Sequence, residues 1–226
     1  MALQARTAGG RPRYDPYRHR HDLYLKAAPI LRTFGYRQVT MKALAHACGV
    51  SAPALYRYFP SKLDFATFPL EETPAGYCAM LLNQAVDAHE DRLQGLRAAL
   101  ELAMVDVDMV VLAVRMAIEA GRDQPEVFSP VRLEAYDAMV RDVLLRCVPG
   151  LGDRAQDLAH TLVSLVVTPG AANAQISRED LWRQMLSVIR AYVLEAGVDR
   201  ARFDAAFPSI LTDRISVTGS LRDGRP

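Results

Sequence analysis

Two short helical patterns joined by a glycine, within residues 40–60, constrain the fold of this chain more than any other feature. Thr40 predicts the start of the first helix, because its side chain can accept a hydrogen bond from an amide of the first turn. Gly49 predicts its end, since glycine adopts the left-handed backbone conformation at little cost. Ser51 predicts the start of the second helix and Pro60 its end. Two short helices around a tight turn form a helix-turn-helix, which presents its second helix to a DNA groove.

Apolar residues at helical spacing support these two helices and predict neighbours on either side. Leu55 and Phe59 lie four residues apart and share one face of the second helix. Residues 22–34 show the same spacing and are followed by Gly35, which predicts an earlier helix with a defined end. Ser61 and Asp64 form an S-x-x-D start signal for a later one. Because short helices with a glycine turn also occur in structural proteins, this spacing alone leaves a purely structural role open.

The charge of the chain is divided unevenly, and this division favours an anionic partner. Residues 1–62 hold eight arginines and three lysines against two aspartates, a net charge of +9. The remaining 164 residues carry a net charge of −8, so that the whole chain is at +1. A small basic part joined to an acidic remainder is typical of nucleic-acid binding. We expect residues 1–20 to form a basic, disordered arm, but the basic bias continues beyond them.

The segment from Leu23 to Phe65 resembles the TetR family of bacterial transcriptional regulators. The residues that carry the resemblance are "GYRQVTMKALAHACGVS" and "ALYRYFPSK". It implies an all-α fold in which residues 21–65 form an N-terminal three-helix DNA-binding domain with a helix-turn-helix. It also implies a larger C-terminal helical domain at residues 66–207, for ligand binding and dimerisation, before a disordered tail at residues 208–226. Pro29 and Phe34 depart from the family pattern, so we expect the first helix to be bent or shortened.

Ten residues around the glycine turn are candidate DNA contacts. Tyr56 and Tyr58 are two residues apart and cannot both face the core; the resemblance implies that their hydroxyls reach backbone phosphates. Arg57 is the residue of the second helix that could make two hydrogen bonds to guanine. The alternatives are tyrosines packed on the first helix and basic side chains in solvent. The expected DNA-binding residues are Thr40, Lys42, Ser51, Ala52, Pro53, Ala54, Tyr56, Arg57, Tyr58 and Lys62.

Helical patterns continue through the rest of the chain. Further helices are expected near residues 75, 91–104, 107–122, 126–148, 153–168, 177–196 and 199–207. The runs "MVVLAV" and "LVSLVV" are rich in β-branched residues, but their helical surroundings favour buried helices over strands.

The resemblance implies that two apolar stripes near the C-terminus form a dimer interface, and dimerisation is also expected because one short recognition helix reads too few base pairs alone. The alternative is that the stripes face the chain's own core. Their residues are Leu158, Leu162, Leu165, Leu181, Met185, Val188 and Tyr192.

The region between these two parts is the expected site for a small-molecule effector. Flexible or aromatic apolar side chains suit an adaptable cavity. The candidates are Met80, Met104, Met109, Met116, Phe128, Tyr136 and Met139, although ordinary core packing is the alternative for each. Polar residues that could orient a ligand are Asn83, His89, Arg115, Glu119, His160 and Asn173.

The sequence offers no motif for catalysis, a cofactor or a metal. G-x-S-x-G, P-loop, G-x-G-x-x-G and H-E-x-x-H patterns do not occur, and the three cysteines are scattered without C-x-x-C. The longest apolar run has six residues, against roughly 20 needed to cross a bilayer. We therefore predict a cytoplasmic homodimer that binds a palindromic double-stranded DNA operator. We expect a repressor released by a small apolar or amphipathic ligand, with no cofactor and no membrane partner. An activator, a ligand-independent DNA-binding protein, and a helical scaffold or enzyme with a basic face are the alternatives.

Overall fold

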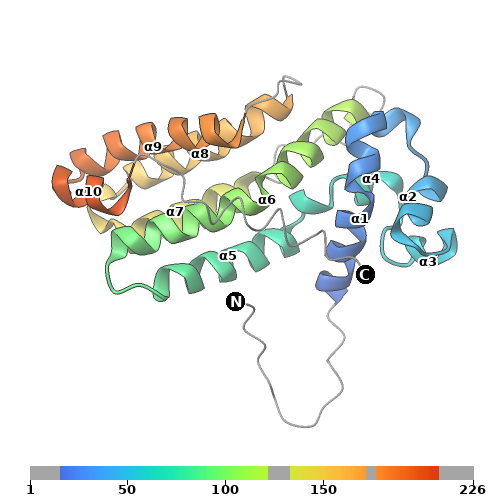
Figure 1. The fold of residues 1–226 in the computed structure, drawn as a ribbon, viewed down its shortest axis with the longest axis horizontal. Helices are drawn as coiled ribbons and strands as arrows, with labels where there is room; N and C mark the ends of the chain where they lie inside the picture. Colours follow the sequence, from blue (N-terminus) through green and yellow to red (C-terminus); the bar gives the residue numbers. More distant parts are fainter. Residues whose placement is uncertain (1–15, 122–132, 172–176, 209–226) are drawn as a thin grey trace, which may run out of the picture.

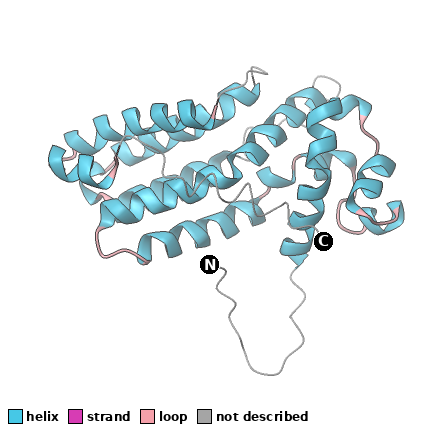
Figure 2. Ribbon diagram, in the orientation of Figure 1, coloured by secondary structure: helices cyan, strands magenta, loops and turns pink. Residues whose placement is uncertain are grey.

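The structure is a computed structural model that describes residues 16–121, 133–171 and 177–208, and within them it holds helices and loops but no strand (Figures 1 and 2). The expected all-α class is therefore confirmed. The α-helices are α1 (Pro16–Gln38), α2 (Met41–Cys48), α3 (Ala52–Tyr56), α4 (Lys62–Ala66), α5 (Glu72–Asp87), α6 (Arg92–Gly121), α7 (Glu134–Cys147), α8 (Arg154–Ala171), α9 (Arg178–Glu195) and α10 (Arg200–Ala206). Short 3-10 turns lie at η1 (Phe68–Leu70) and η4 (Pro149–Leu151).

The helices form two parts, which we call the head (α1 to α4) and the body (α5 to α10). Figure 1 shows the head at one end of the molecule, with α2 and α3 furthest from the body. The long helix α6 runs through the body and reaches the head, where it lies beside α1. The link from head to body is η1, which follows α4 directly.

The start signals of both helices and the glycine turn between them are confirmed, whereas α3 ends at Tyr56, four residues before the expected stop at Pro60. The Thr40 hydroxyl accepts the amide hydrogen bond of Ala43 (3.2 Å), and that of Ser51 accepts from Ala54 (3.3 Å). Gly49 ends α2 with φ 71° and ψ 28°, in the left-handed region. These bonds satisfy amides that the first turns of the helices would otherwise leave without partners.

The first helix begins earlier than expected, and it breaks at Gly35, where its end was expected. It begins at Pro16, so the expected disordered arm is wrong for residues 16–20, whereas residues 1–15 lie outside the described part. Contacts hold this first turn: the Tyr17 ring lies 4.7 Å from that of Tyr77, between centroids. The expected bend at Pro29 is instead a break at Gly35, which has φ 72° and ψ 173°. Phe34, expected on the buried stripe, is 55% exposed.

Helix α6 is one continuous helix of 30 residues, although we expected a break between residues 104 and 107. The runs "MVVLAV" and "LVSLVV" lie in α6 and α8, which confirms that they are helical. The expected helix at residues 126–148 is described from Glu134 onward. The expected tail beyond Pro208 lies outside the described residues.

Each part has its own core, and the two cores meet at α6. The head core gathers side chains of α1 to α4 around Phe59 and Phe65, and it includes Leu112 and Met116 of α6. The body core gathers α5 to α10 around residues such as Leu144 and Leu158. Among the described helices, none combines the length and the hydropathy that a bilayer-spanning helix needs.

Candidate DNA-binding surface and ligand cavity

The residues expected to bind DNA lie on the surface of the head. Leu55 and Phe59 are fully buried, so they fix α3 to the head core, as their spacing predicted. The opposite side of the turn is open to solvent. Thr40, Lys42, Ser51, Pro53, Tyr56 and Arg57 are exposed, and Ala52, Ala54, Tyr58 and Lys62 are half-buried.

The two tyrosines of this surface have different surroundings. Tyr56 is 48% exposed, so its hydroxyl is accessible to a DNA backbone. The Tyr58 ring lies 4.6 Å from the His19 ring of α1, between centroids. Tyr58 therefore packs partly on the first helix, which was the alternative for it, and Tyr56 does not.

Lys62 is held in place by the end of the first helix. Its ammonium group donates to the carbonyl of Tyr36 (2.8 Å) and lies 4.1 Å from the centroid of the Tyr36 ring. These contacts orient the lysine at the start of α4. The sequence did not reveal them, because the two residues are separated by 26 positions.

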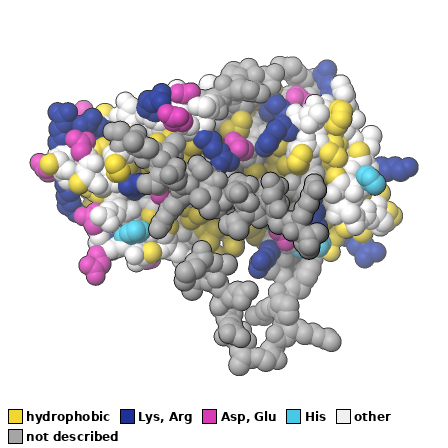
Figure 3. Space-filling model, viewed as in Figure 1, with side chains coloured by type: hydrophobic (Ala, Val, Ile, Leu, Met, Phe, Trp, Pro, Cys, Tyr) yellow, Lys and Arg dark blue, Asp and Glu magenta, His cyan; other side chains and the backbone are white. Residues whose placement is uncertain are grey.

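Positive charge is concentrated in the head. Residues 16–66 contain eight lysines and arginines against two aspartates. In Figure 3, basic side chains project from the right-hand end, where Figure 1 places α2 and α3, whereas acidic and basic side chains are mixed at the left-hand end. A basic surface around an exposed helix-turn-helix suits the phosphates of a duplex.

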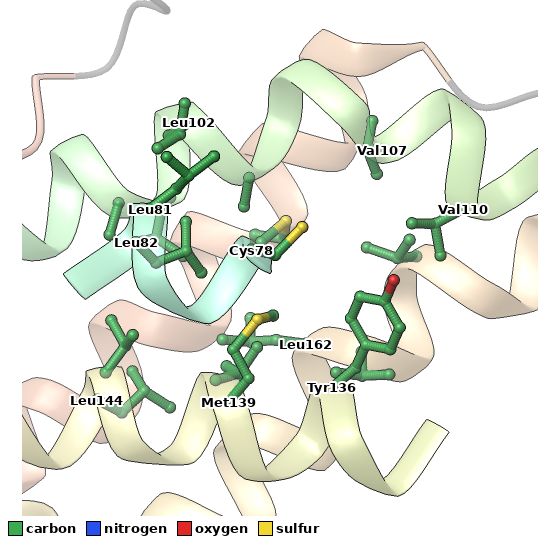
Figure 4. A pocket seen from close by; sticks show the side chains of 18 of the residues that line it. Cys78, Leu81, Leu82, Leu102, Val107, Val110, Tyr136, Met139, Leu144 and Leu162 are labelled. Carbon is green, nitrogen blue, oxygen red and sulfur yellow. The ribbon is translucent and has the colours of Figure 1, made fainter. Parts of the chain in front are cut away.

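The body contains an apolar cavity of about 130 Å³ between α5, α6, α7, α8 and α9 (Figure 4). On α7, Tyr136, Met139 and Val143 face it at helical spacing. Sequence reasoning missed most of its wall, because Leu and Val positions at helical spacing look the same in a solid core. The lining residues comprise Cys78, Leu81, Leu82, Leu96, Ala99, Leu100, Leu102, Ala103, Val107, Val110, Leu133, Tyr136, Met139, Val140, Val143, Leu144, Leu162, Val163, Val166, Val167 and Met185.

Of the residues expected to line the cavity, Tyr136 and Met139 do so. Met104 is buried in the body core and Met80 is 46% exposed, and neither lines the cavity. Met116 belongs to the head core, and Met109 packs against that core. Met116 was misassigned because the head core extends onto α6, whereas Met109 also lines a smaller space beside the cavity. Phe128 lies outside the described residues.

The expected dimer stripes divide into two groups. Leu165, Val188 and Tyr192 are half-buried and keep part of their surface exposed. The other four residues are at most 5% exposed within a single chain, so their assignment to an interface is corrected to the chain's own core; they are Leu158, Leu162, Leu181 and Met185. The alternative that the stripes face inward therefore holds for these four.

Arg115 and Glu119, considered as ligand-orienting residues, instead join α6 to the end of α1. The Glu119 carboxylate accepts the amide hydrogen bond of Tyr36 (2.7 Å). The Arg115 guanidinium donates to the carbonyl of Arg32 (3.1 Å). Asn83 and His160 form polar contacts with Arg146 and Asp137, and Asn173 lies outside the described residues. His89 does not line the cavity.

Two cysteines of the described residues are buried thiols. Burial raises the pKa of the Cys48 thiol to about 11, against a small lowering by Lys26. Burial also raises the pKa of Cys147 to about 11. Both groups are neutral near pH 7, and no three His, Cys, Asp or Glu side chains of the described residues converge on a possible metal site.

Among the comparisons with known proteins, the family match covers most of the head. Residues 26–66 match the family described as bacterial regulatory proteins, tetR family. The HTH-type transcriptional activator FasR of Mycolicibacterium smegmatis is 28% identical over 170 residues, which cover 73% of this chain and 77% of that protein.

Solved structures extend the likeness to the fold of the body. A TetR-family transcriptional regulator from Mesorhizobium loti is 15% identical and covers 80% of this chain and 98% of its own, with a TM-score of 0.54. A gamma-butyrolactone receptor described as ArpA-like is 21% identical and covers 85% and 99%, with a TM-score of 0.52. The family match coincides with the exposed helix-turn-helix and its basic surroundings. Residues 26–66 therefore form a head of the type found in bacterial regulatory proteins of the tetR family, and the chain shares the fold of solved TetR-family regulators.

Proposed function

We propose that this protein binds a palindromic DNA operator as a homodimer and that a small apolar or amphipathic ligand in the body cavity controls this binding. The observation that carries the proposal is that one helix joins the cavity to the core of the head. Helix α6 lines the cavity at Val107 and Val110 and contributes to the head core within the next two turns, at Leu112 and Met116. A ligand that favours one arrangement of α6 thereby changes the affinity of the head for DNA.

The chemistry of the cavity supports an apolar ligand. Among the described residues that line it, there is no Asp, Glu, Lys, Arg or His side chain. An ionised group would lose its hydration there without gaining a partner, which is strongly unfavourable. Met139 and Met185 are unbranched and flexible, so this wall can adapt to ligands of different shape.

Homodimer formation follows from the size of the recognition element. Helix α3 has five residues and exposes few side chains that can contact bases. One such helix gives little sequence discrimination, whereas two copies related by a twofold axis read both halves of a palindrome. The partly exposed residues Leu165, Val188 and Tyr192 of α8 and α9 supply apolar surface for this contact. Sedimentation equilibrium should give twice the mass of the chain, and Val188→Asp should shift the equilibrium toward the monomer.

Our first proposal for the direction of control is that the protein represses transcription and that the ligand relieves this repression. Activation is the second, and it is favoured by the name of FasR, an activator with 28% identity to this chain. Transcription in vitro from a bound fragment separates them. The purified protein lowers the transcript if it is a repressor and raises it if it is an activator.

Selection of genomic fragments by the purified protein tests the DNA-binding half directly. We expect recovered fragments to share an inverted repeat and to bind with an affinity that falls steeply with salt. Tyr56→Phe removes one exposed hydroxyl without disturbing the core, and we expect weaker binding to every sequence. Tyr77→Phe, on the body surface, is the matched control. Equal binding of a shuffled duplex would contradict operator recognition.

A compound screen on the best fragment tests the ligand-binding half. Small apolar molecules that fit the cavity should change the fraction of bound operator. Val107→Trp fills the cavity and should abolish this response while leaving operator binding intact. A full response in this filled variant would place the ligand elsewhere.

A further inference from the structure

Tyr136 differs in chemistry from the rest of the cavity wall. Among the described lining residues, Tyr136 is the one whose side chain carries an oxygen atom, and no described lining side chain carries a nitrogen atom. The remaining lining residues are Ala, Val, Leu, Met and one Cys, whose thiol is a weak donor. A hydrogen-bond acceptor inside this cavity therefore finds its strong side-chain donor at Tyr136.

The Tyr136 hydroxyl connects the cavity with the link between head and body. It donates a buried hydrogen bond to the carbonyl of Pro69, the central residue of η1. Tyr136 lies on α7, 67 positions away in the sequence. This bond thus ties a cavity wall to the segment that follows the last helix of the head.

The head also contacts the link, through Arg20 of α1. The Arg20 guanidinium lies 4.6 Å from the centroid of the Phe68 ring and forms two hydrogen bonds of 2.8 Å with the Glu71 carboxylate. Phe68 is the first residue of η1, and Glu71 directly follows its last. Because Arg20 belongs to α1, movement of η1 is transmitted to the first helix of the head.

Tyr136 also separates two cavities. A smaller space of about 20 Å³ adjoins the link. Tyr136, Cys78 and Val110 line both spaces, and Figure 4 shows Tyr136 near Val110, at the end of the main cavity away from Leu81 and Leu144. The smaller space is further lined by Tyr17, His21, Phe68, Pro69 and Met109.

The size of the main cavity limits the ligand. Its volume of about 130 Å³ is close to that of engineered apolar cavities of about 150 Å³ that bind benzene. A group of one six-membered ring therefore fits without any rearrangement of the wall.

Resting on the proposed function, we infer that Tyr136 is the specificity-determining residue of the cavity. The ligand class is a neutral, ring-sized molecule that carries one hydrogen-bond acceptor. That acceptor takes the tyrosine hydroxyl proton as a hydrogen bond in place of the Pro69 carbonyl, and η1 loses its bond to α7. A hydrocarbon of the same shape fills the cavity but leaves the bond between Tyr136 and Pro69 intact.

The test uses two probes that differ at one position, cyclohexanone and methylenecyclohexane, with a carbonyl oxygen or a methylene group on the same ring. Binding is followed by the fluorescence of Trp182, the single tryptophan, which lies one turn from the cavity residue Met185. The state of the link is followed by hydrogen exchange at the amides of Leu70 and Glu71, which donate within this turn. Wild type, Tyr136→Phe and the surface control Tyr77→Phe are compared, each after a check of folding by circular dichroism.

In wild type and Tyr77→Phe we expect both probes to bind and only cyclohexanone to accelerate exchange at Leu70 and Glu71. In Tyr136→Phe the exchange should be fast without any probe. The preference for cyclohexanone over methylenecyclohexane should be lost, because it rests on the tyrosine hydroxyl binding the ketone more strongly than the Pro69 carbonyl.

Three results would overturn the inference. If both probes accelerate exchange equally, or if Tyr136→Phe keeps the wild-type affinity ratio, Tyr136 does not select the ligand although the cavity binds one. If neither probe binds wild type, the assigned ligand class is wrong. The operator-response screen with Val107→Trp then decides separately whether the proposed function survives.

Discussion

At Gly49 the backbone adopts a left-handed conformation that the turn between α2 and α3 requires. A Cβ atom there would meet nothing within 4 Å, so the cost of a side chain is purely conformational. Gly49→Ala should lower the free energy of unfolding by about 1–2 kcal/mol. Gly76→Ala is the control, because Gly76 lies inside α5 with equally open space. This helical site should gain about 0.5–1 kcal/mol. Urea denaturation measures both, and equal signs would contradict the argument.

Arg57 tests how a nearly bare recognition helix obtains sequence specificity. It is exposed and directly follows α3, whose residues Ala52, Pro53 and Ala54 cannot donate side-chain hydrogen bonds. Arg57→Ala should weaken binding to the selected operator by about 1–3 kcal/mol and relax the preference at one base pair. Fluorescence anisotropy with operator variants measures this. A uniform loss over all duplexes would instead identify a phosphate contact, and Arg183→Ala on α9 is the control far from the head.

Residue-scale features were predictable where their partners are close in sequence. Thr40 and Ser51 cap helices by accepting hydrogen bonds from amides three residues later, so a short stretch of sequence contains both partners of each bond. The contact of Lys62 with Tyr36 and that of Tyr136 with Pro69 join distant segments. Such pairs are fixed by the packing of helices, which spacing along the chain does not encode.

At the scale of elements, the long helix α6 shows why helix ends are harder to predict than helices. Residues 104–108 contain two aspartates, Asp106 and Asp108, but neither glycine nor proline. Aspartate disfavours a helix interior only weakly, and burial of the adjacent Met104 and Val107 outweighs it. The helix therefore continues to Gly121 and connects body and head.

The contact between α6 and α1 supports a prediction about Glu119. Its carboxylate accepts the amide hydrogen bond of Tyr36, immediately after the break at Gly35. Glu119→Ala leaves this amide without the acceptor and should lower the free energy of unfolding by about 1–2 kcal/mol. Glu119→Gln keeps an oxygen acceptor and should cost less than half as much.

Hydrogen exchange at the Tyr36 amide separates this contact from a general loss of stability. It should accelerate in Glu119→Ala and stay near the wild-type rate in Glu119→Gln. Equal exchange rates in the two variants would show that the α6 contact does not hold the end of α1.

At the scale of the whole molecule, the division into head and body was predictable, but the residues at which the two parts contact each other were not. Charge and the helix-turn-helix pattern mark the head, whereas Leu112 and Met116 join the head core from a helix of the body. Apolar periodicity likewise identified the apolar faces of α8 and α9, but not whether each face packs against the chain's own core or against a partner chain. Leu158 and Leu181 face the chain's own core, and a periodic stripe looks the same in either role.

The buried thiols give the folded molecule a predictable dependence on alkaline pH. The pKa of Cys48 and that of Cys147 are each raised from 9.0 to about 11 by burial, so the folded chain keeps both protonated where the unfolded chain ionises. A raised folded pKa contributes stability that is complete below pH 9 and is lost as pH rises through 11. Burial also raises the pKa of Tyr24, which steepens the decline above its ordinary value of 10.0.

Urea denaturation between pH 7 and 11 measures this decline, and a Cys48→Ala, Cys147→Ala double variant isolates the thiols. Cys48 donates a hydrogen bond to the Leu23 carbonyl inside the head core, so the double variant should be less stable at pH 7. Its disadvantage should shrink by roughly 2–5 kcal/mol by pH 11, because the variant has no thiol to ionise on unfolding. A constant difference over the whole range would mean that the two thiols ionise as readily in the folded chain as in the unfolded one.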